Sequence, residues 1–562
     1  MRTVIVGGVA GGMSAATRLR RLDERHEIIV FERSRHVSYA NCGLPYHLGG
    51  VIEERASLIL NTPHRFAERF AIDVRTATEV VSIDRARQVV TAEELATGRR
   101  YETPWDYLVL SPGAAPIVPD VPGVERARTL RTVEDMDKIV SAVREREAAS
   151  AVVVGAGFIG LEAAENLSRA GLGVNVVELA PQVLAPLDPE LAQLVAEELT
   201  KQGVGLSLGS ALAKVLPDSV ELTDGRVLPG DLVVLAMGVR PETALALSAG
   251  LEVGTRGGIR VDERLRTSDP RIYAVGDAVE KTDQLSGEAV LVPLANIANR
   301  QGRIVADDIA GTPRPFQHVQ GSAIIKVFRE VAAVTGWNEK RLKDAGRPYI
   351  AIHIHAGSHA GYYPGGATMA LKLLVDPSAG TILGAEAVGR DGVDKRMDVL
   401  ATAVHAGMAA PELIDLELCY APQFASAKDP VNILGYVAEN RLNGNERAVQ
   451  WHELANHVAK GAIVVDVRGP GEHARGHIPG SVNFPLDDLR ARREELAALA
   501  PSGTEVIVYC LVGLRAHIAS RLLSSWGYNV ANLDGGHLTW SAGTRAQNGA
   551  QAPRYSATQT RR

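Results

Sequence analysis

The sequence is poor in cysteine: only Cys42, Cys419 and Cys510 occur among 562 residues. Three cysteines are too few for a disulfide framework, which favours a reducing compartment. The chain also lacks an uninterrupted apolar run of membrane-spanning length, and its first expected strand, residues 3–6, leaves no room for a signal peptide. We therefore expect a cytoplasmic protein.

Aromatic residues and excess charge are also scarce. Aromatics make up 5% of the chain and the net charge is −6, which argues against a nucleic-acid-binding surface. In contrast, 46% of residues are hydrophobic and 55 are glycine. A chain of this length has room for three or four domains, each with its own core. The many glycines are typical of nucleotide-binding turns.

The apolar pattern predicts an α/β fold. Helical patterns alternate with β-branched runs, which is the βαβ signature of parallel sheets. The expected parallel strands are 4–6, 28–31, 108–110, 152–154, 174–177 and 232–235. Strands expected at 322–329, 332–337, 369–375 and 382–388 look antiparallel, and a polar stretch at 439–446 resembles a linker to a last α/β domain.

The stronger of two Rossmann-type openings lies at residues 152–162, Val-Val-Val-Gly-Ala-Gly-Phe-Ile-Gly-Leu-Glu. Its glycines permit a tight turn, close approach of a pyrophosphate and helix–strand packing. Glu178 follows 23 residues after Gly155, where a carboxylate accepts from a ribose 2′-hydroxyl and repels a 2′-phosphate. We therefore expect NADH rather than NADPH, although NADPH stays possible. The predicted NAD-binding residues are Gly155, Gly157, Phe158, Ile159, Gly160, Glu162, Glu178 and Gly238.

The first opening, residues 4–12, fits the same fingerprint at Gly7 and Gly12 but has Val9 at the second glycine position. Together with Glu32 and the segment 267–277, it resembles the two-dinucleotide-domain flavoprotein reductases over residues 1–440. That resemblance implies bound FAD, reduced by NADH, with Phe158 and Glu162 near the nicotinamide. It also implies FAD contacts from Gly7, Gly8, Ala10, Gly11, Gly12, Glu32, Arg33, Ser111, Gly113, Gly276, Asp277, Ala295 and Tyr420.

Cys42 lies in Ser-Tyr-Ala-Asn-Cys-Gly-Leu-Pro-Tyr, residues 38–46. Disulfide reductases of this superfamily usually carry a Cys-x-x-x-x-Cys pair, but position 47 here is His. Cys42 must therefore pair with a thiol outside the chain or cycle as a sulfenic acid. The following Gly-Leu-Pro suggests a helix start whose dipole lowers the pKa of the thiol. The alternative is an inert buried cysteine, which a polar Gly/Pro-rich segment disfavours.

Three segments, 38–46, 359–365 and 420–430, resemble the coenzyme A-disulfide reductases and their persulfide-reductase relatives. The resemblance implies a Cys42–coenzyme A mixed disulfide and a homodimer in which two tyrosines of the other subunit complete each site. Tyr420 matches one of them, and Tyr362 or Tyr363 the other, with Tyr362 narrowly favoured. Their phenols can donate to a leaving thiolate, or they can simply pack at an interface. Cys419 is interpreted as a structural cysteine.

Coenzyme A carries several phosphate charges, so its site needs cations. Arg18 and Arg21 share one face of the first helix, and Lys428 fits the family's downstream basic position. Each of these could equally be a solvated surface charge. The predicted coenzyme A contacts are Ser14, Arg18, Arg21, Ser38, Asn41 and Lys428.

The C-terminal segment, about 449–541, resembles a rhodanese domain. Cys510 ends an apolar strand and opens the loop Cys510, Leu511, Val512, Gly513, Leu514 and Arg515 before a helix. Backbone N–H groups of such a loop converge on the sulfur and stabilise a thiolate or persulfide. Some rhodanese-like domains lack the cysteine and only bind partners, so its presence favours an active domain. His473 and His477 are interpreted as structural rather than catalytic.

These observations predict a flavoprotein that uses NAD(P)H to reduce coenzyme A persulfide, polysulfide or coenzyme A disulfide, with Cys510 handling sulfane sulfur. Two alternatives remain: an NADH peroxidase or oxidase working through a sulfenic acid, and a redox-sensing interaction protein. The peroxidase group typically carries His where this chain has Ala10. The predicted domains are FAD-binding (1–112 and 246–318), NAD(P)H-binding (113–245), dimerisation (319–440), linker (441–448), rhodanese (449–544) and disordered tail (545–562). No metal is expected.

Overall fold

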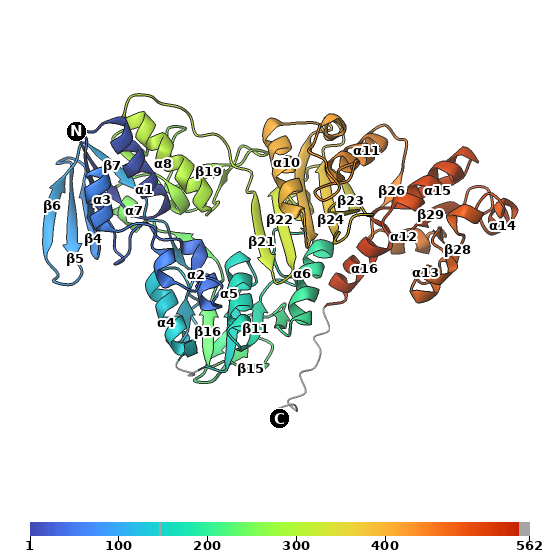
Figure 1. The fold of residues 1–562 in the computed structure, drawn as a ribbon, viewed down its shortest axis with the longest axis horizontal. Coiled ribbons are helices and arrows are strands. Elements are labelled where there is room, and N and C mark those ends of the chain that lie inside the picture. Colours follow the sequence, from blue (N-terminus) through green and yellow to red (C-terminus); the bar gives the residue numbers. More distant parts are fainter. Residues whose placement is uncertain (145–147, 550–562) are drawn as a thin grey trace. The chain divides into compact units, whose positions relative to one another are not determined.

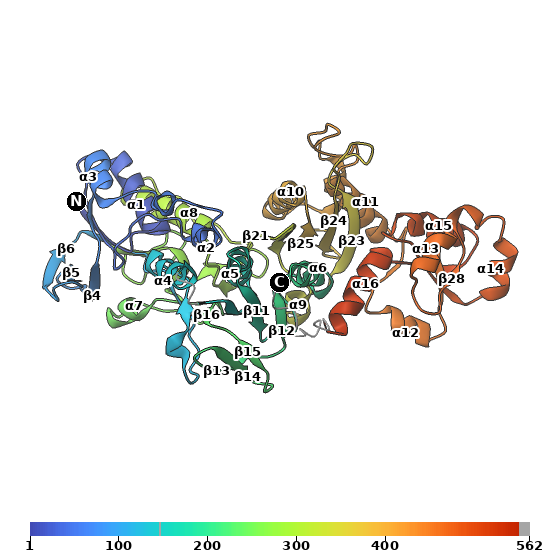
Figure 2. The same ribbon diagram turned by 60° about the horizontal axis from the view of Figure 1, so that its bottom comes forward.

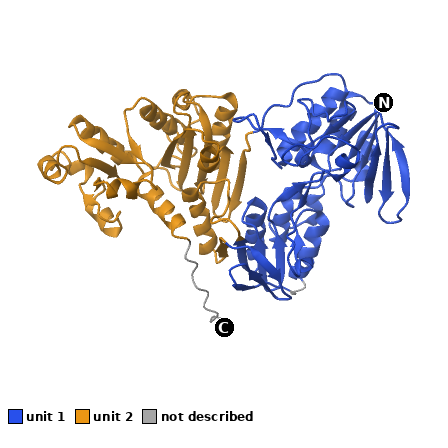
Figure 3. Cartoon of the chain, turned by 180° about the vertical axis from the view of Figure 1, so that it is seen from behind, with its two compact units in different colours: residues 1–177, 210–319 blue, residues 178–209, 320–562 orange. Residues whose placement is uncertain are grey.

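The computed structural model describes residues 1–144 and 148–549. These residues form two compact units, one of residues 1–177 and 210–319 and the other of residues 178–209 and 320–562, with only the part up to 549 described (Figure 3). The second unit includes residues 178–209, which the sequence places inside the NAD(P)H-binding domain. The domain boundaries themselves stay a prediction.

The first sheet of unit 1 has the strand order β18-β7-β1-β2-β3, and its strands pair in parallel. Its central strands contain the apolar runs 4–6, 28–31 and 108–110, as expected for a parallel sheet covered on both faces. Helices α1 and α8 pack against each other (Figure 1). The bounds are β1 Arg2–Val6, α1 Ala10–Leu22, β2 Glu27–Phe31, β3 Asp73–Arg75, β7 Tyr107–Leu110, β18 Ile272–Ala274 and α8 Ala295–Ile309.

A second parallel sheet in unit 1 contains the run β11-β10-β16-β9. Antiparallel sheets β4-β5-β6 and β13-β14-β15 flank the two parallel sheets. The bounds of the second sheet and its helices are β9 Arg128–Thr129, α4 Val133–Arg144, β10 Ser150–Val154, α5 Phe158–Arg169, β11 Gly173–Glu178 and β16 Leu232–Leu235. Those of the flanking sheets are β4 Thr78–Asp84, β5 Val89–Glu94, β6 Arg100–Pro104, β13 Leu212–Val215, β14 Ser219–Leu222 and β15 Val227–Pro229.

Unit 2 contains an antiparallel sheet with the order β21-β22-β25-β24-β23. Helices α10 and α11 bury their apolar faces on it. The sequence pattern found four of these strands and missed β23. The bounds are β21 Ala323–Val327, β22 Glu330–Gly336, α9 Glu339–Asp344, β23 Ile350–Gly357, β24 Thr368–Val375, β25 Ile382–Gly389, α10 Val393–Ala406 and α11 Pro430–Leu442. Helix α6, Pro189–Lys201, belongs to this unit as well.

The last sheet is parallel, with the order β26-β30-β29-β27-β28. Its final helix α16 lies beside α6 in both ribbon views (Figures 1 and 2). The bounds are β26 Ala448–Val449, α12 Leu454–Ala459, β27 Ile463–Asp466, α13 Pro470–Arg475, β28 Val482–Asn483, α14 Arg493–Leu499, β29 Glu505–Tyr509, α15 Leu514–Ser525, β30 Asn529–Leu533 and α16 Gly536–Gln547.

Two sequence expectations differ from the structure at the edges of this domain. The segment expected as a polar linker contains Arg441 and Glu446, whose side chains are buried, and Arg441 pairs with Asp534 at 2.7 Å. A tail was expected from residue 545, but α16 continues to Gln547. Residues 550–562 lie outside the described residues. Among the residues described, no helix is long and apolar enough to cross a membrane.

Candidate active site

Both glycine-rich turns have the backbone geometry of a dinucleotide site. Gly7 has φ +103°, and a Cβ there would lie 2.0 Å from the carbonyl oxygen of Ser111. A Cβ on Gly12 would lie 1.9 Å from the carbonyl oxygen of Gly7. Only glycine fits either position, because any side chain would collide with backbone. The turn therefore brings the start of α1 close to the strand ends, as a bound pyrophosphate requires.

The second turn repeats this arrangement. A Cβ on Gly155 would lie 2.3 Å from the carbonyl oxygen of Ala236, and one on Gly160 would lie 1.9 Å from the carbonyl oxygen of Gly155. Gly157, which caps α5, has nothing within 4 Å of its Cβ position. This open side leaves room for a phosphate group to approach the backbone. The residues present therefore fit both FAD and NAD(H).

The two predicted ribose-binding carboxylates, Glu32 and Glu178, lie at strand ends. Glu32 follows β2 and accepts hydrogen bonds from the N–H groups of Gly8 (2.7 Å) and Ser34 (2.8 Å). Burial raises the pKa of Glu32, and these two bonds oppose that rise. Glu178 ends β11 and accepts from the N–H of Ala180 at 2.8 Å. Both carboxylates are thus fixed at the carboxyl edges of their sheets.

Arg131 lies beside two of the remaining predicted FAD residues, Asp277 and Gly113. Asp277 lies in the 3₁₀ turn η4, Gly276–Ala278, and Arg131 reaches it at 3.5 Å. The Arg131 guanidinium also covers Gly113, whose φ is +78°. Sequence reasoning missed Arg131, which lies outside every motif. Ser111 is next to Gly7 and Gly11, and Ala295 begins α8. Arg33 pairs with Glu242 at 2.9 Å, at an exposed position.

Cys42 is exposed and lies in the 3₁₀ turn η1, Asn41–Gly43, which precedes the short helix α2, Leu44–Leu48. Partial burial raises the pKa of the Cys42 thiol, the Glu162 carboxylate raises it further, and Arg131 opposes the rise. The expected lowering of this pKa by a helix N-terminus is therefore wrong. The helix begins two residues later and has only five residues, so its dipole is too weak to outweigh desolvation.

Glu162 and Tyr46 form the polar boundary beside Cys42. Tyr46 Oη donates to Glu162 Oε1 at 2.9 Å, which ties α2 to α5. Burial raises the pKa of Glu162, and the bond from Tyr46 opposes this. A residue of the predicted nicotinamide site thus lies close enough to influence the thiol. Phe158 begins α5, Ile159 is exposed on the same helix, and Gly238 has φ +108°.

The predicted coenzyme A contacts have mixed surroundings. Arg18 forms an ion pair with Asp307 at 2.7 Å, and Ser14 donates to Asn299 at 2.6 Å. Arg21 and Lys428 are exposed, and Ser38 adopts φ +50° three residues before the start of η1. Asn41 adjoins Cys42, with its amide oxygen 3.9 Å from the thiol sulfur. Arg18 is thus already neutralised, whereas Arg21 and Lys428 are available to a phosphate.

Tyr362 and Tyr420 meet in unit 2, with their phenol oxygens 3.2 Å apart. They are 77% and 51% exposed, so both hydroxyls can reach a partner molecule. Tyr363 instead packs edge-on against His359. Cys419 is exposed rather than buried, and it lines a shallow cleft of about 300 Å³ with Lys395, Tyr420, Ala421 and Phe424. A purely structural role for Cys419 therefore has no core packing to support it.

The C-terminal cysteine lies at a strand end, as expected. Cys510 follows β29, is fully buried and accepts a hydrogen bond from the N–H of Gly513 at 3.1 Å. Arg515 forms two hydrogen bonds of 2.7 Å with Glu472. Glu472, and to a smaller extent Cys510, raise the pKa of the Arg515 guanidinium. Leu511 and Leu514 are exposed at the rim of the loop, beside Val512. His473 bonds Asp466 at 2.9 Å and stacks on His477, so both rings have structural partners.

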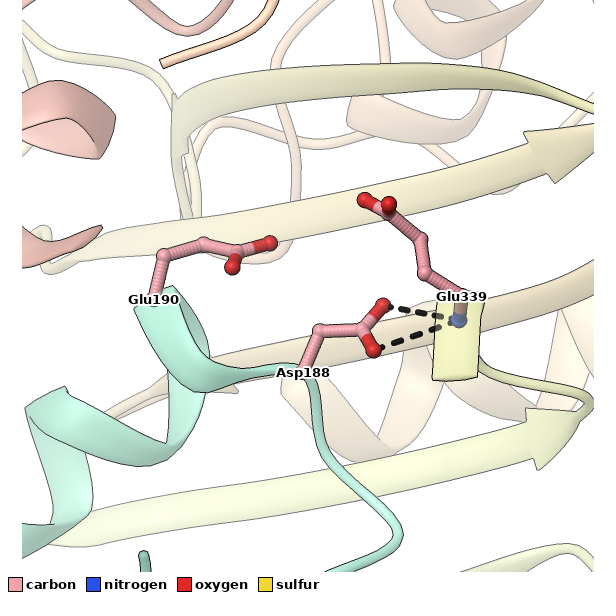
Figure 4. A group of neighbouring side chains, drawn as sticks. All are labelled: Asp188, Glu190 and Glu339. Atoms are coloured by element: carbon pink, nitrogen blue, oxygen red, sulfur yellow. Dashed lines mark hydrogen bonds between the residues drawn. The ribbon is translucent and has the colours of Figure 1, made fainter. Parts of the chain in front are cut away.

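Three buried carboxylates in unit 2 lie as close together as the ligands of a metal ion. Carboxylate oxygens of Asp188, Glu190 and Glu339 lie within 4.8 Å of one another, and Asp188 also bonds the backbone N–H of Glu339 (Figure 4). The Lys372 ammonium contacts all three carboxylates, at 2.8, 2.5 and 2.6 Å respectively. Lys372 is thus a cation that all three carboxylates share.

Family models match three parts of the chain. They are the pyridine nucleotide-disulphide oxidoreductase over residues 1–302, its dimerisation domain over 323–430 and a rhodanese-like domain over 450–543. Coenzyme A disulfide reductase of Staphylococcus aureus is 35% identical over 441 residues, which cover 78% of this chain and all of that protein.

Solved structures extend the match across the C-terminal domain. Reduced Bacillus anthracis CoADR-RHD is 45% identical with a TM-score of 0.94, covering 96% of this chain and 98% of that one. An NAD-dependent persulfide reductase from A. fulgidus is 38% identical with a TM-score of 0.90, covering 96% and 100%. A water-forming NADH oxidase from Lactobacillus brevis, at 23% identity, shows the fold alone. The chain therefore belongs to the pyridine nucleotide-disulphide oxidoreductase family, as a coenzyme A disulfide reductase-like flavoprotein that uses NAD(P)H and carries a C-terminal rhodanese domain.

Proposed function

We propose that this enzyme reduces a coenzyme A persulfide or a related sulfane-sulfur compound, and that coenzyme A disulfide is a second substrate. The observation that carries the proposal is the isolation of Cys42. It is free, exposed and the sole cysteine in the sequence of its unit. Its disulfide partner must therefore come from outside that unit, and a small thiol such as coenzyme A supplies one.

The chemistry at Cys42 is thiol–disulfide exchange. The Cys42 thiolate attacks the sulfur atom that is bonded to carbon in coenzyme A, the S–S bond breaks, and a mixed disulfide between Cys42 and coenzyme A forms. The leaving group, which is coenzyme A thiolate from the disulfide or hydrosulfide from the persulfide, takes up a proton. FAD, when bound, would pass on two electrons from NADH, and these would reduce the mixed disulfide to the Cys42 thiolate and free coenzyme A. The net reaction with a coenzyme A persulfide consumes NADH and a proton and releases NAD⁺, coenzyme A and hydrogen sulfide.

The raised pKa of Cys42 gives Arg131 a role. At neutral pH a thiol with a raised pKa is mostly protonated, so attack needs a nearby positive charge to favour the thiolate. The positive charge of Arg131 acts to lower the pKa of Cys42, and an ion pair with Asp277 at 3.5 Å holds the guanidinium in place. We propose that Arg131 supports thiolate formation as the substrate arrives.

We further propose a homodimer in which Tyr362 and Tyr420 donate protons at the partner's Cys42. The two phenols are exposed and share a hydrogen bond of 3.2 Å, so one hydroxyl supports the other as it donates. The match to the family's dimerisation domain over residues 323–430 supports the dimer, and both tyrosines lie on that segment. The three free thiols also support a reducing, cytoplasmic location.

The Cys42→Ser variant tests the central proposal, with Cys419→Ser as the matched control. Cys42→Ser should lose NADH-dependent reduction of both coenzyme A persulfide and coenzyme A disulfide, whereas the control should keep both. The purified enzyme should also carry a Cys42 peptide that loses the mass of coenzyme A on treatment with a thiol reductant. Retained persulfide turnover in Cys42→Ser would refute the assignment. Faster NADH oxidation with peroxide or oxygen than with either sulfur substrate would favour an oxidase.

A further inference from the structure

A buried histidine joins the antiparallel sheet of unit 2 to its C-terminal domain. His353 lies on β23, and its ring is almost completely buried. Nδ1 lies 2.7 Å from Asp534 Oδ2, and Nε2 lies 2.9 Å from Glu190 Oε1. A neutral imidazole has only one N–H, whereas a carboxylate only accepts. The geometry therefore requires His353 to be an imidazolium that donates to both carboxylates.

Asp534 is held from several directions. Besides the His353 ring, it accepts the backbone N–H of His353 at 3.0 Å, Arg441 at 2.7 Å and Gln450 at 3.2 Å. Arg441 comes from α11 and His353 from β23, so both elements fix the same carboxylate. Asp534 is itself 3% exposed. Removing one cation would leave a buried charge without its partner, which proteins tolerate poorly.

The segment that follows Asp534 supports the cysteine loop. Gly535 and Gly536 have φ values of +65° and +64°, and they lead into α16. The Cβ position of Gly535 is 2.8 Å from His353 Cβ, and that of Gly536 is 2.6 Å from the carbonyl oxygen of Cys510. No side chain fits in either place, so this stretch of backbone is clamped between His353 and the cysteine loop.

Two further bonds join the same segment to the loop. The N–H of His537 donates to the carbonyl oxygen of Cys510 at 2.8 Å, and that of Leu538 donates to Leu511 at 3.1 Å. These bonds hold two carbonyl groups of the loop, and on the same loop the Gly513 N–H donates to Cys510 Sγ at 3.1 Å. The direction of the loop amides decides how well the loop stabilises a thiolate or persulfide.

We propose that His353 is a positioning residue for sulfur transfer at Cys510: by holding Asp534, it fixes the 535–538 backbone on which the persulfide loop rests. This inference rests on the proposed role of Cys510 in handling sulfane sulfur. His353 lies in the dimerisation domain, 157 positions before Cys510 in the sequence. The dimerisation domain would therefore take part in the chemistry of the rhodanese domain.

The charges around His353 come from every element packed on it. Glu190 and Asp188 come from α6 and its cap, Lys372 from β24, Glu386 from β25, Glu339 from α9, His355 from β23, Arg441 from α11, and Asp534 from the rhodanese domain.

Burial lowers the pKa of His353 and Lys372 lowers it further. The bonds to Asp534 and Glu190 outweigh both and raise the pKa to about 9. The positioning contact is thus present at neutral pH and is lost as the pH rises through about 9.

The test uses His353→Asn, with His355→Asn as its matched control. His355 lies on the same strand and also contacts the rhodanese domain, through Thr539 at 2.8 Å, but it does not bond Asp534. The pH profile of iodoacetamide labelling is measured for Cys510 by peptide mass spectrometry in the holoenzyme, with Cys42 as the internal reference. Sulfur transfer from glutathione persulfide to cyanide is the second readout.

His353→Asn should shift the Cys510 labelling profile upward by about one pH unit and slow sulfur transfer about tenfold. The Cys42 profile and NADH-dependent reduction of coenzyme A disulfide should stay as in the wild type. An unmoved Cys510 profile, or an equal shift in His355→Asn, would overturn the proposal. A wild-type Cys510 that never acquires sulfur would instead refute the proposed role of Cys510.

Asp534→Asn changes the other end of the same bond and should shift the Cys510 profile in the same direction. If neither variant folds, the wild-type enzyme still decides. Its sulfur transfer to cyanide, expressed per cyanide anion, should fall as the pH rises through about 9, while NADH-dependent reduction of coenzyme A disulfide shows no such fall. A wild-type profile without that fall would count against the proposal.

Discussion

Tyr46 donates a hydrogen bond of 2.9 Å to Glu162, and this bond ties the cysteine-bearing segment to helix α5, which follows the second glycine-rich turn. Burial raises the pKa of Cys42, and Glu162 raises it further. One carboxylate of α5 therefore acts on the thiol through space.

Glu162→Gln should lower the pKa of Cys42. The substitution removes a negative charge that disfavours the thiolate, so the thiolate should form at lower pH, by up to about one pH unit. The measurement is the rate of Cys42 alkylation against pH in the absence of NADH. Tyr46→Phe is the companion variant. It loses the hydrogen bond but keeps the Glu162 carboxylate, so the pKa of Cys42 should stay raised. Identical profiles for Glu162→Gln and wild type would show that burial alone raises the thiol pKa.

Glu178 should give the enzyme a preference for NADH over NADPH. Its carboxylate is held at the end of β11 by the Ala180 N–H, where it can accept from a 2′-hydroxyl. A charge-assisted hydrogen bond contributes about 1.5–3 kcal/mol, so Glu178→Gln should reduce the ratio of kcat/KM for NADH over NADPH by about 10- to 100-fold. Glu221→Gln on β14 is the control and should leave the ratio unchanged. A wild-type enzyme with equal kcat/KM for both nucleotides would show that Glu178 does not select between them.

Cys510→Ser should separate the two sulfur chemistries. It should abolish sulfur transfer from thiosulfate or a persulfide to cyanide, because no nucleophile is left in the loop to carry the sulfur. Reduction of a small free persulfide should survive, since Cys42 can attack it directly. NADH oxidation with coenzyme A disulfide and sulfide release from a persulfide are the two assays. If all persulfide reduction is lost, sulfur must pass through Cys510 first. If no sulfur reaction changes, the rhodanese domain serves only for binding.

The cluster around Lys372 should not depend on a metal ion. Treatment with EDTA should leave thermal unfolding unchanged, because the ammonium already occupies the space between the three carboxylates. Lys372→Met should destabilise the protein by about 3–5 kcal/mol, since it leaves buried carboxylates without their cation. Lys395→Met removes a partly exposed lysine and should cost less than about 1 kcal/mol. The assignment would be contradicted if Lys372→Met were as stable as the wild type. It would also be contradicted if Mg²⁺ stabilised the wild-type protein.

The motifs at Gly7, Gly155, Cys42 and Cys510 could be recognised in the sequence because each is continuous along the chain. A glycine turn or a cysteine loop is built from neighbouring residues, and the backbone geometry that it needs restricts the residue types locally. The parallel strands were predictable for a similar reason, since a strand buried on both faces must be apolar throughout. Strand β23 was missed, although apolar and polar residues alternate at its end in Ile352-His-Ile-His355. Histidine is a polar residue type, so a strand that contains two of them is not recognised from the sequence as part of a core.

The sequence by itself determined the family, the cofactors and the two thiols, because those depend on short-range patterns. Only the tertiary structure decided the electrostatics. Burial raises the pKa of Cys42, against the shift expected from the helix alone, and Glu162, which is 120 residues away in the sequence, raises it further. Likewise, neither Lys372 among its carboxylates nor His353 between Glu190 and Asp534 could be read from any motif. Charges interact through space, and burial strengthens the interaction, so their effects depend on which distant segments the fold brings together.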